Sequence, residues 1–197
     1  YSIQQTTDGG YIVAGYTESF GAGNYDAYIL KLNSDGSLAW QKTFGGSNYD
    51  QAYSIQQTTD GGYIVAGYTE SFGAGNYDAY ILKLNSDGSL AWQKTFGGSN
   101  YDQAYSIQQT TDGGYIVAGV TNSFGAGSSD VYVLKLNSDG SLAWQRTFGG
   151  DGVDQAYSIQ QTTDGGYIVA GDTNSFGAGG SVYILKLDSN GELHPFE

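Results

Sequence analysis

A repeat with a fixed period dominates the sequence. The stretch from Tyr1 to Ala52 starts again at Tyr53, Tyr105 and Tyr157, and residues 53–104 match residues 1–52 at every position. Self-similarity at a constant spacing of this length is typical of propellers, solenoids and other repeat architectures. The chain must therefore be built from copies of one small unit, whose structure decides the whole fold.

Each repeat contains four segments with the pattern of β-strands. In the first copy these are residues 1–6, 10–17, 27–33 and 37–44. Residues 10–17 are apolar on both faces, as expected of a strand that is packed between two layers. Residues 37–44 alternate, which predicts that Leu38, Trp40 and Phe44 share one face. No segment combines helical spacing with capping residues, so the sequence predicts an all-β protein.

Two kinds of connection join these strands. Asp8-Gly9 and Asp35-Gly36 are tight-turn signals, because glycine adopts positive φ without steric cost. The connections over residues 19–28 and 43–53 are longer and resemble each other, each with a Phe-Gly start and an Asn-Tyr-Asp end. Consecutive strands of a meander alternate in direction. Both Asp-Gly turns should therefore lie at one end of the unit and both Asn-Tyr-Asp loops at the other.

Four-stranded antiparallel units of this length are the blades of β-propellers. The sequence predicts one domain over residues 1–197, with four near-identical blades at 1–52, 53–104, 105–156 and 157–197. A β-solenoid is the main alternative, although its coils are usually shorter and lack Asp-Gly hairpins.

Two motifs resemble known propeller repeats. Residues 27–46, AYILKLNSDGSLAWQKTFGG, resemble the third and fourth strands of quinoprotein-like (PQQ-type) repeats, and residues 8–15, DGGYIVAG, resemble delta-60 repeats. The first resemblance implies that Trp40, Trp92 and Trp144 dock between neighbouring blades. The near-identical copies offer no counterpart of the cofactor and Ca²⁺ residues of quinoprotein dehydrogenases, so the resemblance implies a propeller and not a dehydrogenase.

The fourth copy departs from the others at its end. Pro195 stands where the first copy has Trp40, and proline cannot donate a hydrogen bond to a strand ladder. We therefore expect the last blade to be truncated. The sequence starts with Tyr1 rather than Met, which suggests a processed chain or a piece of a longer one. A closed four-bladed ring, a homo-oligomer of two chains that completes a larger ring, and a fragment of a longer array all remain open.

Charge and composition restrict the partners. Twenty acidic residues against seven basic ones give a net charge of −13, which argues against nucleic acid and anionic membrane surfaces. No apolar run is long enough for a membrane span. The chain has no cysteine, so it has neither disulfides nor a cysteine-based metal site.

The Asn-Tyr-Asp loops are the best candidates for a ligand site. Tyrosine rings stack on the apolar face of a sugar, and Asn and Asp bond its hydroxyl groups. The loop carboxylates of Asp26, Asp78 and Asp130 could also hold Ca²⁺, which prefers oxygen ligands. The structural alternatives are that the aspartates accept hydrogen bonds from their own turns and that the tyrosines pack against neighbouring loops. The candidate ligand-binding residues are Asn24, Tyr25, Asp26, Asn48, Tyr49, Asp50, Asn76, Tyr77, Asp78, Asn100, Tyr101 and Asp102.

Repetition also bears on activity. A catalytic site needs an asymmetric set of groups, whereas these blades present the same residues several times. The sequence therefore predicts a non-catalytic binding module, outside or on the surface of a prokaryotic cell, with a glycan or protein ligand. The alternative is a purely structural assembly module, such as a component of a surface layer or fibre.

Overall fold

The computed structural model describes residues 1–177 and 179–194, and this part of the chain is all β. Blade 1 comprises β1 (Ser2–Gln5), β2 (Tyr11–Thr17), β3 (Asp26–Leu32) and β4 (Leu38–Phe44). Blade 2 comprises β5 (Asp50–Gln57), β6 (Tyr63–Thr69), β7 (Asp78–Leu84) and β8 (Leu90–Phe96). Blade 3 comprises β9 (Asp102–Gln109), β10 (Tyr115–Thr121), β11 (Asp130–Leu136) and β12 (Leu142–Phe148). Blade 4 comprises β13 (Asp154–Gln161), β14 (Tyr167–Thr173) and β15 (Ser181–Leu187).

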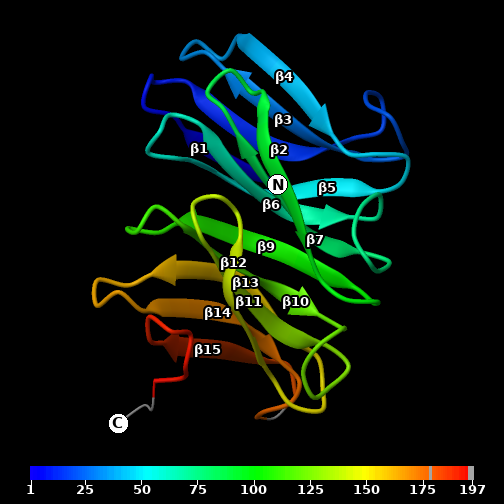
Figure 1. Cartoon of the computed structure of the whole chain (residues 1–197), viewed down its shortest axis with the longest axis vertical. Helices are drawn as coiled ribbons and strands as arrows, with labels where there is room; N and C mark the ends of the chain where they lie inside the picture. The colour runs from blue at the N-terminus through cyan, green and yellow to red at the C-terminus, as the bar shows by residue number, and fades with distance from the viewer. Residues whose placement is uncertain (178, 195–197) are drawn as a thin grey trace.

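Every blade is an antiparallel meander whose strands follow chain order. The four sheets succeed one another from the blue end of the chain to the red end, as Figure 1 shows. The predicted propeller of four-stranded blades is therefore confirmed. The first strand of blades 2 to 4 begins three residues before the repeat boundary, at Asp50, Asp102 and Asp154.

The Asp-Gly turns close through a small set of local bonds. In blade 2, Thr58 N donates to Gly62 O at 2.9 Å, and Asp60 Oδ1 accepts from Gly62 N at 2.9 Å. Gly61 has a φ of +80°, which favours glycine at this position. The buried Lys83 of β7 reaches this turn, with Nζ 2.9 Å from Asp60 Oδ2. This ion pair ties the third strand of the blade to its first turn, and blades 1, 3 and 4 repeat it.

The hydrophobic core lies between the blades. Each blade has a face with two tyrosines, such as Tyr63 and Tyr80, which we call the tyrosine face. In blades 2 to 4 this face packs on the preceding blade. The opposite face carries two alanines in blades 1 and 2, such as Ala66 and Ala79, and one alanine and one valine in blades 3 and 4. In blades 1 to 3 it packs on the following blade, and we call it the alanine face. Strands β6, β7, β10 and β11 are buried on both sides, as the apolar pattern of the second strand predicts.

Trp40 of β4 reaches across to blade 2. Its ring lies 5.8 Å from the ring of Tyr63, edge to face, and covers Gly88 so closely that a Cβ there would lie 2.9 Å from the indole. Trp92 and Trp144 make the same contacts on blades 3 and 4. The docking of these tryptophans between blades is thus as expected.

One predicted strand face is wrong. Lys31 pairs with Trp40, but Leu32 pairs with Leu38, so Ala39 is an extra residue in β4. Such a bulge reverses the alternation of side chains beyond it. Leu38 therefore lies on the opposite face from Trp40 and is half exposed.

The last blade is shorter, as predicted. Within the described residues it has three strands, followed by an isolated bridge between Leu187 and Leu193. Pro195, on which the prediction of truncation rested, lies outside the described residues. The described part of the chain contains no helix with the length and apolarity that crossing a membrane requires.

Candidate ligand-binding face

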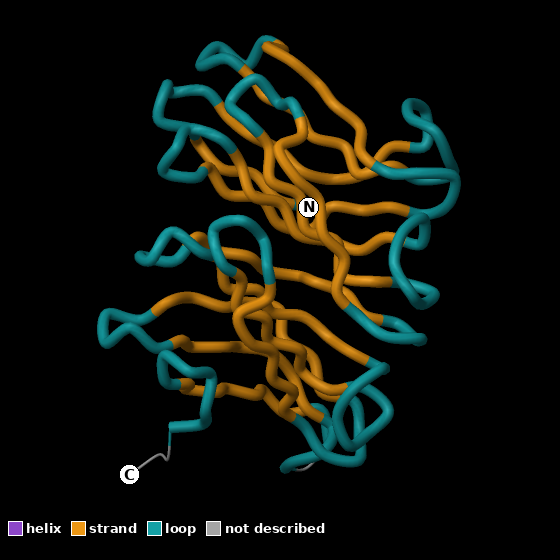
Figure 2. The backbone as a smooth tube through the Cα atoms, viewed as in Figure 1, coloured by secondary structure: helices purple, strands orange, loops and turns teal. Residues whose placement is uncertain are grey.

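The longer loops gather at one end of the blades, opposite the Asp-Gly turns, as the meander predicts (Figure 2). The β2–β3 loop of blade 1 lies beside the β4–β5 loop, because Tyr25 and Tyr49 form a parallel bridge and Asp50 N donates to Tyr25 O at 2.7 Å. Glu70 N, in the β6–β7 loop, in turn donates to Tyr49 O at 2.8 Å. The loops therefore form one continuous surface, which we call the loop face.

Blades 1 and 2 place pairs of tyrosine rings on the loop face. The rings of Tyr25 and Tyr49 lie 4.9 Å apart at an interplanar angle of 77°, and those of Tyr77 and Tyr101 lie 4.8 Å apart at 68°. Edge-to-face geometry leaves part of each ring open. Tyr49 is 36% exposed and Tyr101 is 46% exposed, so each pair presents an aromatic surface to a ligand.

The tyrosine pairs continue inward towards the axis of the propeller. The ring of Tyr25 contacts that of Tyr16 at 4.8 Å, and Tyr16 stacks on Tyr1 at 5.7 Å. Blade 2 repeats the path through Tyr68 and Tyr53. The first-strand tyrosines then form a ladder across all four blades, with 5.1, 5.4 and 5.7 Å between successive rings of Tyr1, Tyr53, Tyr105 and Tyr157.

Carboxylates border the tyrosine pairs. A hydrogen bond with Glu18 is the main cause of a raised pKa of Tyr25, and the charge of Glu18 adds to it. The pKa of Tyr77 is raised mainly by desolvation and next by the charge of Glu70. Both phenols therefore stay protonated at neutral pH beside a carboxylate. Ionised carboxylates also accept hydrogen bonds from hydroxyl groups of a ligand.

The loop asparagines are exposed, and they fall into two classes. Asn24 and Asn76 make no side-chain hydrogen bond among the described residues, so both amides are open to a ligand. Asn48 Nδ2 donates to Glu70 O at 3.3 Å, and Asn100 Nδ2 donates to Asn122 O at 3.1 Å. The oxygens of these two amides remain as acceptors beside Tyr49 and Tyr101.

The loop aspartates lie beneath this surface. Asp50 is fully buried and accepts from Gly46 N at 2.8 Å and from Ser71 Oγ at 2.6 Å. Asp26 is also buried and accepts from Gly23 N at 3.2 Å. These are the contacts of the structural alternative, in which a loop carboxylate organises its own turn. The same burial applies to Asp78, Asp102, Asp130 and Asp154.

The aspartates also approach one another in pairs. A Cβ on Gly45 would lie 2.6 Å from both Asp26 Oδ1 and Asp50 Oδ2, so this glycine is required where the two carboxylates converge. Desolvation raises the pKa of Asp78, and the nearby Asp102 adds to the rise. Within the described residues no group of three or more acidic, His or Cys side chains could hold a metal ion. A Ca²⁺ bound at Asp26, Asp78 or Asp130 would need further oxygens from backbone or water.

The loop face is not uniform around the blades. At the positions of Tyr25 and Tyr49, blade 3 and the connection to blade 4 carry Ser129 and Val153, which form the same parallel bridge. Ser129 Oγ donates to Asn122 Oδ1 at 3.0 Å, an interaction that replaces the aromatic pair. The exposed tyrosine pairs therefore belong to blades 1 and 2.

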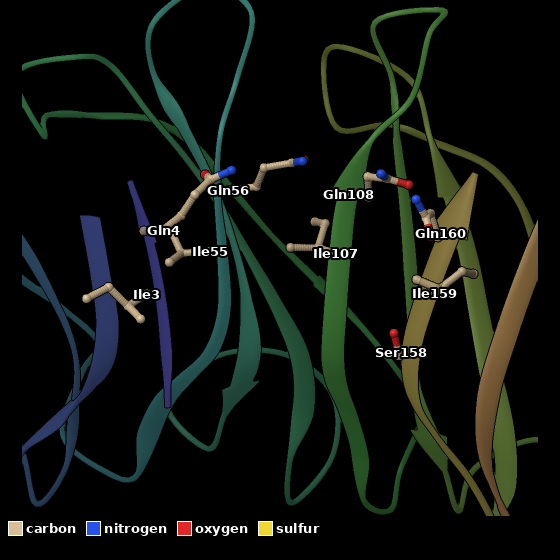
Figure 3. Close-up of a pocket in the computed structure, with 9 residues that line it drawn as sticks. All are labelled: Ile3, Gln4, Ile55, Gln56, Ile107, Gln108, Ser158, Ile159 and Gln160. Carbon is tan, nitrogen blue, oxygen red and sulfur yellow. The ribbon is translucent and has the colours of Figure 1, made fainter. Parts of the chain in front are cut away.

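Sequence reasoning missed a groove along the axis. The first strands of the four blades line an open groove of about 320 Å³, to which each blade contributes an isoleucine and a glutamine (Figure 3). Gln4 Oε1 accepts from Gln57 N at 2.7 Å, and blades 2 and 3 repeat this bond. The signal in the sequence was the polar and apolar alternation of the first strand, which is the innermost strand of each blade. The lining residues are Ile3, Gln4, Ile55, Gln56, Ile107, Gln108, Ser158, Ile159 and Gln160.

Comparisons with known proteins give distant structural neighbours. The chain is similar to a bifunctional GH43-CE protein of Bacteroides eggerthii, with 14% identity over 98% of this chain and 26% of that one and a TM-score of 0.49. The endo-1,5-alpha-L-arabinanase of Thermotoga petrophila RKU-1 gives 15% identity over 98% of this chain and 58% of that one, with a TM-score of 0.49. Sqt1 of Chaetomium thermophilum gives 12% identity over 93% of this chain and 42% of that one, with a TM-score of 0.47.

A family assignment comes from the repeats themselves. No curated protein matches the chain. The specific resemblance to quinoprotein-like and delta-60 repeats stays a prediction. Residues 6–38, 58–90, 110–142 and 162–195 match the family described as "Domain of unknown function (DUF5122) beta-propeller". These segments make up more than half of the sequence and recur once per blade, so the chain belongs to the DUF5122 β-propeller family.

Proposed function

We propose that this chain is a non-catalytic binding module that recognises glycans through the loop face of blades 1 and 2. The observation that carries the proposal is the two edge-to-face tyrosine couples, Tyr25 with Tyr49 and Tyr77 with Tyr101, in each of which the second ring is exposed. Both couples lie at the same end of the propeller, so one ligand chain can contact both.

The chemistry around the tyrosines suits a sugar. An aromatic ring offers an apolar face with little loss of conformational entropy on binding, because tyrosine has only two side-chain torsions. The open amides of Asn24 and Asn76 both donate and accept hydrogen bonds. Glu18 and Glu70 add acceptors beside Tyr25 and Tyr77.

Two similar subsites favour a repeating ligand. A single tyrosine couple would bind a sugar weakly, but two couples on one rigid face add their affinities through a high effective concentration. An oligosaccharide with a regular repeat therefore suits this face better than a monosaccharide.

The absence of catalysis is part of the proposal. Blades 1 and 2 are identical in sequence, so they offer the same groups twice instead of an asymmetric set of nucleophile, base and charge stabiliser. We further propose that the module acts outside the cell or on the surface of a prokaryote. The burial of the loop aspartates supports binding without Ca²⁺.

A glycan-array screen tests the function. The labelled protein would be applied at low salt, once with Ca²⁺ and once with a chelator. We expect signal on oligosaccharides in both runs. Signal that disappears with the chelator would overturn the Ca²⁺-independent site, and an array without signal in both runs would overturn the glycan-binding function. Under that outcome the structural assembly role, supported by the exposed outer faces of blades 1 and 4, becomes the better account.

A further inference from the structure

The same interface joins blades three times within the chain. The alanine face of one blade packs on the tyrosine face of the next, which buries Ile12 and Ile29 of blade 1 against Tyr63 and Leu82 of blade 2. Blades 2 and 3, and blades 3 and 4, repeat this packing with equivalent residues. The protein therefore contains its own template for what covers each face of a blade.

Hydrogen bonds between first strands reinforce the interface. Ser2 Oγ accepts from Ile55 N at 3.3 Å, and Gln4 Oε1 accepts from Gln57 N at 2.7 Å. In the other direction, Thr7 N donates to Gln57 Oε1 at 2.8 Å. The next two interfaces contain the same three bonds.

On blade 1, none of the described residues covers the tyrosine face as a preceding blade would. Ile3 of blade 1 is 67% exposed, whereas Ile55 and Ile107 at the same position in blades 2 and 3 are 5% exposed. Tyr1, at the head of the tyrosine ladder, is also largely exposed. Strand β1 thus exposes an isoleucine whose counterpart is buried in blades 2, 3 and 4.

On blade 4, the alanine face is left uncovered by the part of the chain that the structure describes. Val182 is 79% exposed and Ile184 is 43% exposed on blade 4, whereas Ala79 and Ile81 at these positions in blade 2 are fully buried. Substantial exposed apolar surface of this kind marks an interaction site more often than a solvent-facing surface.

The unused hydrogen-bonding groups match as well. Ser158 and Gln160 of β13 are exposed at the positions where Ser2 and Gln4 accept bonds from the following blade. Blade 1 has the donors these acceptors require, Ile3 N and Gln5 N, because they correspond to Ile55 N and Gln57 N. The two end faces therefore complement each other in shape, apolarity and hydrogen bonding.

We propose that a second copy of this chain covers both end faces. The alanine face of blade 4 packs on the tyrosine face of blade 1 of the second copy, and the reverse contact closes the ring. A head-to-tail contact yields either a closed ring or an open fibre. Propellers typically have four to eight blades, and two chains of four blades reach the upper end of this range. The ring also encloses the axial groove on all sides.

The junction between chains lacks one contact of the internal interfaces. A Cβ on Gly36 of blade 1 would meet no atom within 4 Å, whereas Gly88 of blade 2 lies under Trp40. The described part of blade 4 ends without a fourth strand that could supply such a tryptophan. The net charge of −13 on each chain also opposes association. The two-chain ring should therefore dissociate on dilution and at low salt before the blades unfold.

A measurement of the native mass tests the proposal. It uses light scattering after gel filtration, in about 0.15 M salt and at about 1 to 100 μM protein. We expect about 42 kDa at the highest concentration, twice the 20.9 kDa of one chain. Val182→Glu places a charge on a side chain that is exposed in the single chain, so it should fold and run at the mass of one chain. Leu90→Glu, at an exposed position outside both end faces, is the matched control and should keep the mass of two chains.

Three outcomes would overturn the proposal. They are a single-chain mass of the unmodified protein throughout the concentration range, a two-chain mass of the Val182→Glu variant, and an open series of larger species. None of them bears on the glycan site, because the loop face lies outside these end faces. The glycan array can therefore refute the proposed binding function without affecting the two-chain ring, and the mass measurement can refute the ring without affecting the binding function.

Discussion

The repeats provide an internal control for a prediction about one glycine. Gly15 of β2 in blade 1 and Gly67 of β6 in blade 2 occupy the same position of the repeat. A Cβ on Gly67 would lie 1.8 Å from Gln51 O, and 2.9 Å from the Cα of Ala52. A Cβ on Gly15 would meet no atom within 4 Å, because the first strand of blade 1 does not extend opposite Gly15.

These geometries predict opposite effects of alanine. In Gly67→Ala the carbonyl of Gln51 must retreat by more than 1 Å, and this carbonyl belongs to backbone at the bulge between Ala52 and Ser54. Overpacking against rigid neighbours costs roughly 1–3 kcal/mol, and a backbone clash of this size should cost about 3 kcal/mol or more. In Gly15→Ala the added methyl group lowers the conformational entropy of the unfolded chain and causes no clash in the folded state. The free energy of unfolding should therefore stay the same or rise by up to about 1 kcal/mol.

Thermal unfolding followed by circular dichroism measures the difference. For a protein of this size, about 3 kcal/mol corresponds to a decrease in Tm of roughly 6–12 °C. We expect Gly67→Ala to unfold earlier by at least that amount and Gly15→Ala to match or exceed the unmodified protein. Equal Tm values for the two variants would refute the close packing of β5 on β6.

Three further predictions concern the interfaces and charged groups. Trp92→Ala should lower the free energy of unfolding by about 2–3 kcal/mol in urea denaturation, because the ring packs on the next blade. The control Leu90→Ala, at an exposed position, should change it by less than about 0.5 kcal/mol. Partial desolvation alone would raise the pKa of Asp60, but hydrogen bonds from Thr58 and Lys83 lower this pKa to about 2. The stability of the folded state should therefore fall as the pH drops from about 4 to 2. Asp60→Asn should flatten this pH dependence in acid titrations. Burial raises the pKa of Tyr115 to about 12, so the folded state should lose stability as the pH rises from about 10 to 12. In a titration over this range, the absorbance of tyrosinate should rise together with unfolding.

The repeat and the turn residues predicted most of the fold. Asp-Gly pairs fixed the hairpins, and the meander put Tyr25 and Tyr49 at one end, because these features depend on local sequence and strand direction alone. The face of Leu38 was wrong because the bulge at Ala39 is a register change that alternation in one strand does not encode. Such shifts depend on how two strands pair.

The sequence predicted that the loop residues gather at one end of the blades, but it did not predict which of them are buried. The sequence placed Asn, Tyr and Asp in the same loops, and the structure separates them into exposed amides and rings above buried carboxylates. Asp50 is buried because residues distant in sequence, such as Ser71 of the next loop, supply its donors. The contrast between blades 1 and 3 was visible as the change from Tyr25 to Ser129, although only the structure shows that Tyr25 packs edge to face on Tyr49.

The glycan array applied to a variant with the loops of blade 3 tests the central claim most directly. The changes Tyr25→Ser, Tyr49→Val, Tyr77→Ser and Tyr101→Val bring in residues that form the same bridge in blade 3, so the fold should be retained. We predict that the unmodified protein binds oligosaccharides. This variant, with an unchanged circular dichroism spectrum, should lose at least 90% of the signal below saturation, which is equivalent to about 1.4 kcal/mol or more of binding free energy. A folded variant with undiminished signal would contradict the assignment of the ligand site to the tyrosine pairs.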